Sequence, residues 1–305
     1  MSRVARHIAS LAALGALIAA TAADGRAQTE AATATDTHAQ SVQGLPREGR
    51  GGDVKPNTRV GRPSVGKEEY IRYCVGCHGD RGDGMGENTQ WIDPKPRDFT
   101  QATFKCRSTP SGTLPTDQDI INTIRRGIVN SNMPQWRPLT DQMQADLLSY
   151  IKTFSPRWTT EKAGTPVVIP PETPVTTESI LAGRQMFQKF ECWKCHGTEG
   201  RGDGPSASTL TDNKDQPIHP YDFTTGTRFK CGTTNADLYR IFMTGLDGTP
   251  MASFADNIKG DQGWDLVHYL RTLQPLRTPE SVLWKTWLAT HAGELKPIGP
   301  ESGGR

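Results

Sequence analysis

Cys74-Val75-Gly76-Cys77-His78 and Cys192-Trp193-Lys194-Cys195-His196 are two copies of one pattern in a chain of 305 residues. Two thiols separated by two residues, with a histidine directly after the second thiol, have the spacing that attaches a c-type haem. The thiols form thioethers on one edge of the haem, and the histidine binds the iron. The pattern therefore predicts two covalently bound haem c groups, with Cys74, Cys77, Cys192 and Cys195 as the thioether residues.

Two other uses of paired cysteines explain less of the pattern. Zinc ribbons place their two CxxC pairs about 15–20 residues apart, whereas these pairs lie in different halves of the chain. A thioredoxin-like dithiol motif needs no histidine after it. Because neither use accounts for both histidines, we favour haem attachment over zinc binding or dithiol redox chemistry.

The chain repeats itself beyond the two motifs. Met133 follows His78 by 55 residues, and Met251 follows His196 by 55 residues. The equal spacing makes His78 with Met133, and His196 with Met251, the candidate axial ligands of two irons. Three further segments have counterparts: Arg81-Gly82-Asp83-Gly84 with Arg201-Gly202-Asp203-Gly204, Asp98-Phe99-Thr100 with Asp222-Phe223-Thr224, and Phe104-Lys105-Cys106 with Phe229-Lys230-Cys231. These matches indicate a duplicated domain.

Each half resembles a class I cytochrome c domain, in which CxxCH lies near the start and a methionine on a later loop caps the haem. The resemblance covers roughly residues 64–158 and 176–275. It implies a dihaem cytochrome c with a mainly α fold, built from two tandem, loop-rich domains that each wrap round one covalent haem. The chain departs from the simplest family pattern because Cys106 and Cys231 are extra, and because Met251 lacks the proline that follows Met133.

Residues 1–27 have the features of a secretory signal peptide. Arg3 and Arg6 give a positive start, residues 8–23 form an apolar run, and Gly25-Arg26-Ala27 offers small residues for cleavage. An uncleaved membrane anchor is the alternative, but the run is short of the roughly 20 residues that a spanning helix needs. We therefore expect a mature chain without a membrane span, exported to a periplasm.

Composition divides the rest of the chain. Residues 28–63 have almost no large apolar side chain, which predicts a disordered leader, and residues 159–175 are rich in proline, which predicts a semi-stiff linker. Residues 276–305 form a tail whose Trp284 and Trp287 either hold a partner or, as we favour, fold back on the second domain.

Apolar spacing predicts helices that lead into each haem motif and helices that close each domain. The ranges are 67–74, 178–190, 141–154 with Thr140 as a cap, and 262–273. A stripe of Ile120, Ile121, Ile124 and Ile128, with its counterpart Leu238, Phe242 and Leu246, predicts a further helix in each half.

The formal net charge of +2 and the absence of a basic cluster argue against nucleic acid as a partner. The glycine-rich runs 79–86 and 197–204 lack the preceding strand and the following GK[ST] of a phosphate loop, so tight passage of the backbone beside the haem is the favoured interpretation. Four cations near the Phe-Lys-Cys segments are candidate partners of the haem propionates, although each is equally well explained as a solvated charge: Arg97, Lys105, Arg228 and Lys230.

An iron held by histidine and methionine has no open position for a substrate, so its chemistry is the exchange of single electrons. The sequence thus predicts an electron carrier between a donor, which is a dehydrogenase or other oxidoreductase or a quinol-oxidising protein, and an acceptor cytochrome or oxidase. The carrier is either free or a subunit of a larger oxidoreductase. The alternative is a dihaem enzyme, a peroxidase or an oxidase of a small sulfur compound, in which one haem loses its methionine.

Cys106 and Cys231 occupy the same place in the two repeats and lie outside the haem motifs. In an oxidising compartment two spare thiols tend to join, and equivalent positions meet where two related halves face each other. A Cys106–Cys231 disulfide is therefore one interpretation, and two separate small buried residues, each against its own haem, are the other.

Overall fold

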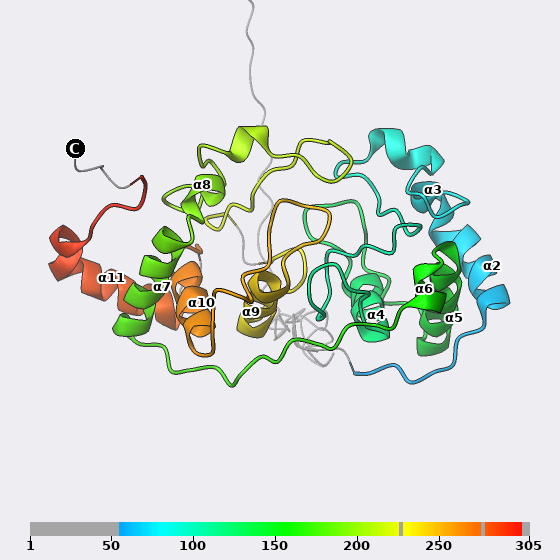
Figure 1. The fold of residues 1–305 in the computed structure, drawn as a ribbon, viewed down its shortest axis with the longest axis horizontal. Helices are drawn as coiled ribbons and strands as arrows, with labels where there is room; N and C mark the ends of the chain where they lie inside the picture. The colour runs from blue at the N-terminus through cyan, green and yellow to red at the C-terminus, as the bar shows by residue number, and fades with distance from the viewer. Residues whose placement is uncertain (1–54, 226–227, 276–277, 301–305) are drawn as a thin grey trace, which may run out of the picture. The chain divides into compact units, whose positions relative to one another are not determined.

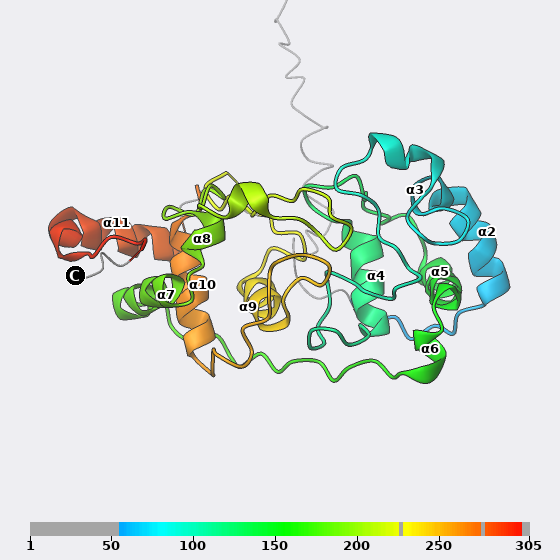
Figure 2. The same cartoon turned by 45° about the horizontal axis from the view of Figure 1, so that its top comes forward.

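The computed structural model describes residues 55–225, 228–275 and 278–300, a range that is helical and loop-rich and contains no β-strand (Figures 1 and 2). The elements of the first half are α2 (Pro63–Tyr73), α3 (Val75–His78), η1 (Glu87–Trp91), α4 (Asp117–Arg126), α5 (Asp141–Ile151), η2 (Lys152–Phe154) and α6 (Arg157–Thr160). Those of the second half are α7 (Thr177–Lys189), α8 (Trp193–His196), η3 (Ala207–Thr209), α9 (Asn235–Thr244), α10 (Gln262–Thr272), α11 (Pro279–His291) and η4 (Ala292–Glu294).

The predicted helices are confirmed in type and order, and the differences lie at their ends. Thr140 caps α5 by accepting a hydrogen bond from the backbone N–H of Met143. The last members of the two apolar stripes, Ile128 and Leu246, lie beyond α4 and α9. Each of these helices stops before a glycine with positive φ, which L side chains rarely adopt, at Gly127 (63°) and Gly245 (68°).

Each half has its own hydrophobic core. Ile120, Ile121 and Ile124 of α4 pack with Leu147 and Leu148 of α5 in the first half. Aromatic side chains of α7, α9 and α10 fill the core of the second half: Phe187, Tyr239, Phe242, Trp264 and Tyr269. The duplication seen in the sequence is thus a duplication of packed cores.

The helix before each haem motif crosses the helix that closes the domain at a glycine. Figure 1 shows α2 beside α5 and α7 beside α10. A Cβ added at Gly66 would lie 1.9 Å from the carbonyl oxygen of Asp146, and one added at Gly183 would lie 1.9 Å from that of Asp265. Only glycine permits these two backbones to approach so closely.

Substitution of Gly183 by alanine should destabilise the protein because the new methyl group must force α7 away from α10. We expect a loss of about 1–3 kcal/mol in the free energy of unfolding, the usual cost of overpacking, measured by urea unfolding of the haem-loaded chain. Gly293→Ala is the matched control, since no atom lies within 4 Å of the added Cβ. Equal stabilities of the two variants would contradict the close helix crossing.

The two halves are joined by a disulfide between Cys106 and Cys231, whose Cα atoms lie 5.1 Å apart. The sequence left open whether these cysteines form a disulfide or stay separate, and the structure contains the disulfide. Asp247 of the second half adds polar contacts with the first: it pairs with the buried guanidinium of Arg107 at 2.8 Å and accepts hydrogen bonds from the Ser111 hydroxyl and the Gly112 N–H. A covalent bond and a nearly buried ion pair therefore fix this junction.

Haem-loaded protein that is denatured without a reductant should take up no iodoacetamide, because four cysteines are held in thioethers and two in the disulfide. After reduction we expect two alkylated thiols per chain, counted by mass spectrometry. The Cys231→Ala variant provides the control, with one thiol alkylated before reduction. Two alkylated thiols in the unreduced wild-type chain would exclude the bridge.

The chain segments flanking the two cores pack against them. In the predicted leader, Asn57 and Arg62 bond to the first domain: the amide of Asn57 donates to the carbonyl oxygen of Asp141 at 2.7 Å, and Arg62 pairs with the buried Asp146 at 2.6 Å. The prediction of disorder through residue 63 is therefore wrong for this stretch, because it counted apolar side chains and overlooked polar contacts. Residues 1–54, which include the predicted signal peptide and most of the predicted leader, lie outside the described range.

The C-terminal tail contains the helix α11, which packs on α7 and α10. Trp284 is buried in the core of the second half and Trp287 packs against it, so the tail folds back on the second domain as favoured from the sequence. None of the helices within the described residues has the length and apolar character needed to cross a membrane.

Candidate haem sites

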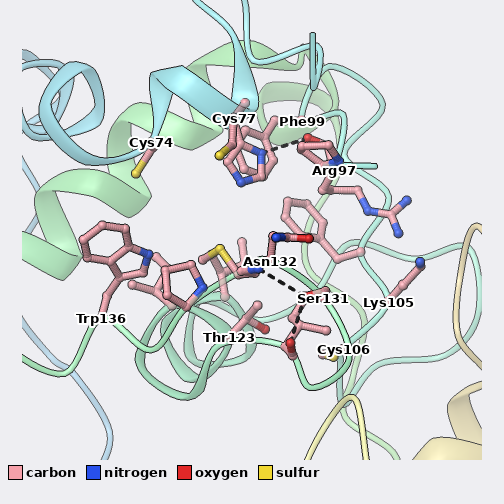
Figure 3. A pocket seen from close by; sticks show the side chains of 18 of the residues that line it. Cys74, Cys77, Arg97, Phe99, Lys105, Cys106, Thr123, Ser131, Asn132 and Trp136 are labelled. Atoms are coloured by element: carbon pink, nitrogen blue, oxygen red, sulfur yellow. Dashed lines mark hydrogen bonds between the residues drawn. The ribbon is translucent and has the colours of Figure 1, made fainter. Parts of the chain in front are cut away.

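A pocket in the first half brings together the four residues that the motif spacing singled out: Cys74, Cys77, His78 and Met133. Cys74 follows α2, Cys77 and His78 lie on α3, and Met133 lies on the loop between α4 and α5. Figure 3 shows Cys74 and Cys77 on one side of the pocket, with Asn132 and Thr123 on the opposite side and Trp136 towards one end. Apolar side chains of α4 and α5 complete the wall, including Ile120, Ile124, Leu147 and Ile151.

Each motif histidine is oriented by a hydrogen bond to a backbone carbonyl. His78 Nδ1 lies 3.1 Å from the carbonyl oxygen of Arg97, and His196 Nδ1 lies 3.1 Å from that of Tyr221. A carbonyl only accepts, so Nδ1 carries the proton and donates it, which leaves the lone pair of Nε2 free to bind a metal. Burial lowers the pKa of both histidines, which favours the neutral imidazole that a metal requires.

The loop that carries each methionine is closed in the same way in the two halves. The N–H of Ile128 bonds to the carbonyl of Met133 at 3.1 Å, and the N–H of Leu246 bonds to that of Met251 at 2.9 Å. The N–H of each methionine donates a hydrogen bond of 3.2 Å to a hydroxyl two residues earlier. This hydroxyl belongs to Ser131 in the first half and to Thr249 in the second. The two predicted methionine ligands therefore lie in equivalent, well-held loops, although only Met133 is followed by proline.

The repeated Asp-Phe-Thr segment, which the sequence showed only as a match between the two halves, supports each histidine. The ring of Phe99 stacks on His78 with centroids 4.4 Å apart, and Phe223 lies 5.0 Å from His196. The Asp222 carboxylate accepts from the N–H and hydroxyl of Thr224 at 2.8 and 2.7 Å, and Asp98 does the same for Thr100. The repetition of this segment in both halves was the sequence signal that could have indicated this role.

Cys74 and Cys192 are partly buried, and this burial raises the pKa of each thiol to about 12. A thiol at such a pKa is almost wholly protonated at neutral pH, whereas dithiol exchange and zinc binding use the thiolate. The environment of these two thiols therefore suits dithiol exchange poorly. Within the described residues no group of three or more His, Cys, Asp or Glu side chains is placed to hold a metal ion, which leaves zinc without a site there.

Three of the four predicted propionate partners, Arg97, Lys105 and Lys230, line the first pocket. Arg97 and Lys105 lie at the end opposite Trp136 in Figure 3. Arg228 is exposed and is not part of this lining. An apolar pocket with thiols and an oriented imidazole on one side, a thioether on another and cations at one end fits a covalently attached haem.

The comparisons with known proteins agree with this geometry. Residues 180–274 match the family model described as "Cytochrome c", and residues 61–151 match that described as "Cytochrome C oxidase, cbb3-type, subunit III". A solved structure of a chain in a reducing HAO-like protein complex of Kuenenia stuttgartiensis is 44% identical, with a TM-score of 0.68. The similarity covers 72% of this chain and 98% of that one. A search of the curated proteins found no match.

The fold, the paired motifs and these matches define the class of protein. The chain belongs to the class I c-type cytochromes, with two cytochrome c domains in tandem. Such domains bind haem c and transfer electrons.

Substitution of either loop methionine should open one iron of the haem-loaded protein. The weak charge-transfer band at the red end of the ferric spectrum reports methionine bound to iron, so we expect Met133→Ala and Met251→Ala each to remove part of it and the double variant to remove it all. Met143→Ala, a change in α5, is the control and should leave the band intact. A full-strength band in either loop variant would contradict its ligand assignment.

Proposed function

We propose that the protein is an exported, periplasmic carrier with two haem c groups that passes single electrons from a donor oxidoreductase to an acceptor cytochrome or oxidase. The observation that carries the proposal is that both halves have the same ligand arrangement, a carbonyl-oriented histidine and a methionine on a closed loop. A haem bound by both residues supplies reversible one-electron chemistry without an open coordination position.

The protein's own residues hold the donor atoms in place before and after each transfer. The carbonyls of Arg97 and Tyr221 retain the proton on Nδ1 of each histidine, so the lone pair of Nε2 stays available to bind a metal. Apolar side chains of α4 and α5 keep water from the first pocket. A ligand set that does not rearrange lowers the cost of each electron transfer, which is the property that a carrier needs.

We favour a carrier that is a bound subunit of a complex over one that diffuses freely. The 44% identical relative is a chain of an HAO-like protein complex, and nearly the whole of that chain is matched. We infer that this cytochrome is a subunit of a larger complex, in which it exchanges electrons with a catalytic partner. Purification of the native protein under mild conditions should therefore yield a species larger than one chain.

The competing function is that of a dihaem enzyme, such as a peroxidase or a sulfur-compound oxidase. The purified full chain should be reduced and reoxidised rapidly by small redox partners yet show no steady-state turnover of hydrogen peroxide or thiosulfate. Met133→Ala, with one position opened, is the positive control for the peroxide assay. Sustained turnover by the unaltered chain would favour the enzyme over the carrier.

A further inference from the structure

The first haem pocket is not built from the first half alone. Lys230 belongs to the second half, yet it lines the pocket that contains Cys74, His78 and Met133. It is next to Cys231, and the sulfur of Cys106 lies 3.7 Å from its carbonyl oxygen. The disulfide therefore holds the backbone of Lys230 at the edge of the neighbouring domain's pocket.

Three cations gather at this edge: Lys230, Lys105 and Arg97. Burial, together with the positive charges of Arg97 and Lys230, lowers the pKa of Lys105 to about 8. Within the described residues none of the three side chains forms an ion pair or a hydrogen bond. Carboxylates act on them only from a greater distance: Asp212, Asp247 and Asp98 on Arg97, Asp212 on Lys105, and Asp93 on Lys230. A cluster of partly buried cations without a bound carboxylate is costly unless an anionic group joins it.

Haem carries two propionates on the edge opposite the thioethers, and these supply such a group. We propose that Lys230 is a positioning residue for the haem of the other domain, where its ammonium group pairs with a propionate of the haem attached at Cys74 and Cys77. The reduction potential of the first haem thus depends on how the second half is docked. The inference rests on the proposed two-haem function.

The sign of the effect follows from charge. A nearby positive charge disfavours the ferric iron, which carries one more positive charge than the ferrous iron, and so raises the potential. Lys230→Gln in the haem-loaded full chain should therefore lower the midpoint potential of the first haem more than that of the second. Lys230→Arg keeps the charge, and Lys285→Gln removes an exposed charge from α11. Both variants should leave the two potentials at their wild-type values.

Spectroelectrochemical titration measures both potentials, and Met133→His identifies the wave of the first haem because a second histidine lowers its potential. A shift of that wave by Lys230→Gln that is no larger than the shift of the other wave would overturn the inference. The number of haems per wild-type chain must also be counted, because it distinguishes a wrong assignment of Lys230 from a wrong two-haem function. Fewer than two haems per chain would overturn the two-haem function, and the inference with it.

Discussion

The hydrogen bond from Nδ1 of each motif histidine to a backbone carbonyl is the constraint on which both sites depend. It selects the tautomer and aims Nε2 away from the carbonyl. The same geometry explains why a glycine follows each histidine, since Gly79 and Gly197 turn the chain with φ of 76° and 78°. A side chain at Gly197 would also place its Cβ 2.0 Å from the carboxylate of Asp203. The glycine-rich runs thus serve the histidine, with no need of a phosphate to explain them.

The connection between the halves gives the duplication a consequence for electron transfer. The disulfide and the contacts of Asp247 hold a junction that includes the edge of the first haem pocket. The Arg107 side chain is fully buried at this junction. It pairs with Asp247 and donates a hydrogen bond of 2.5 Å to the Thr244 carbonyl. Removal of either charge of this pair would leave the other largely buried with hydrogen bonds but without its opposite charge. Two domains locked in this way would hold the two proposed haems at a fixed separation, which suits the transfer of electrons from one to the other.

Much of this architecture was predictable because repetition in sequence reports repetition in structure. The motifs, the equal histidine-to-methionine spacing and the apolar stripes gave the fold class, the order of helices and the four residues in the first pocket. Long-range geometry was not predictable: nothing in the spacing of Cys106 and Cys231 decides whether two chain segments meet. Nor could a single sequence show that Lys230 lines the pocket of the other domain, or that Arg62 binds Asp146, because such contacts depend on how the elements pack.

The central claim is that both irons are closed by histidine and methionine, and electron paramagnetic resonance of the unaltered ferric protein tests it most directly. A six-coordinate iron with these ligands is low-spin, whereas an iron that has lost its methionine to water or to an empty position gives a high-spin signal. With both irons closed, we expect low-spin signals that integrate to two per chain, with no high-spin component. A stoichiometric high-spin signal would contradict the central claim and would point to a dihaem enzyme.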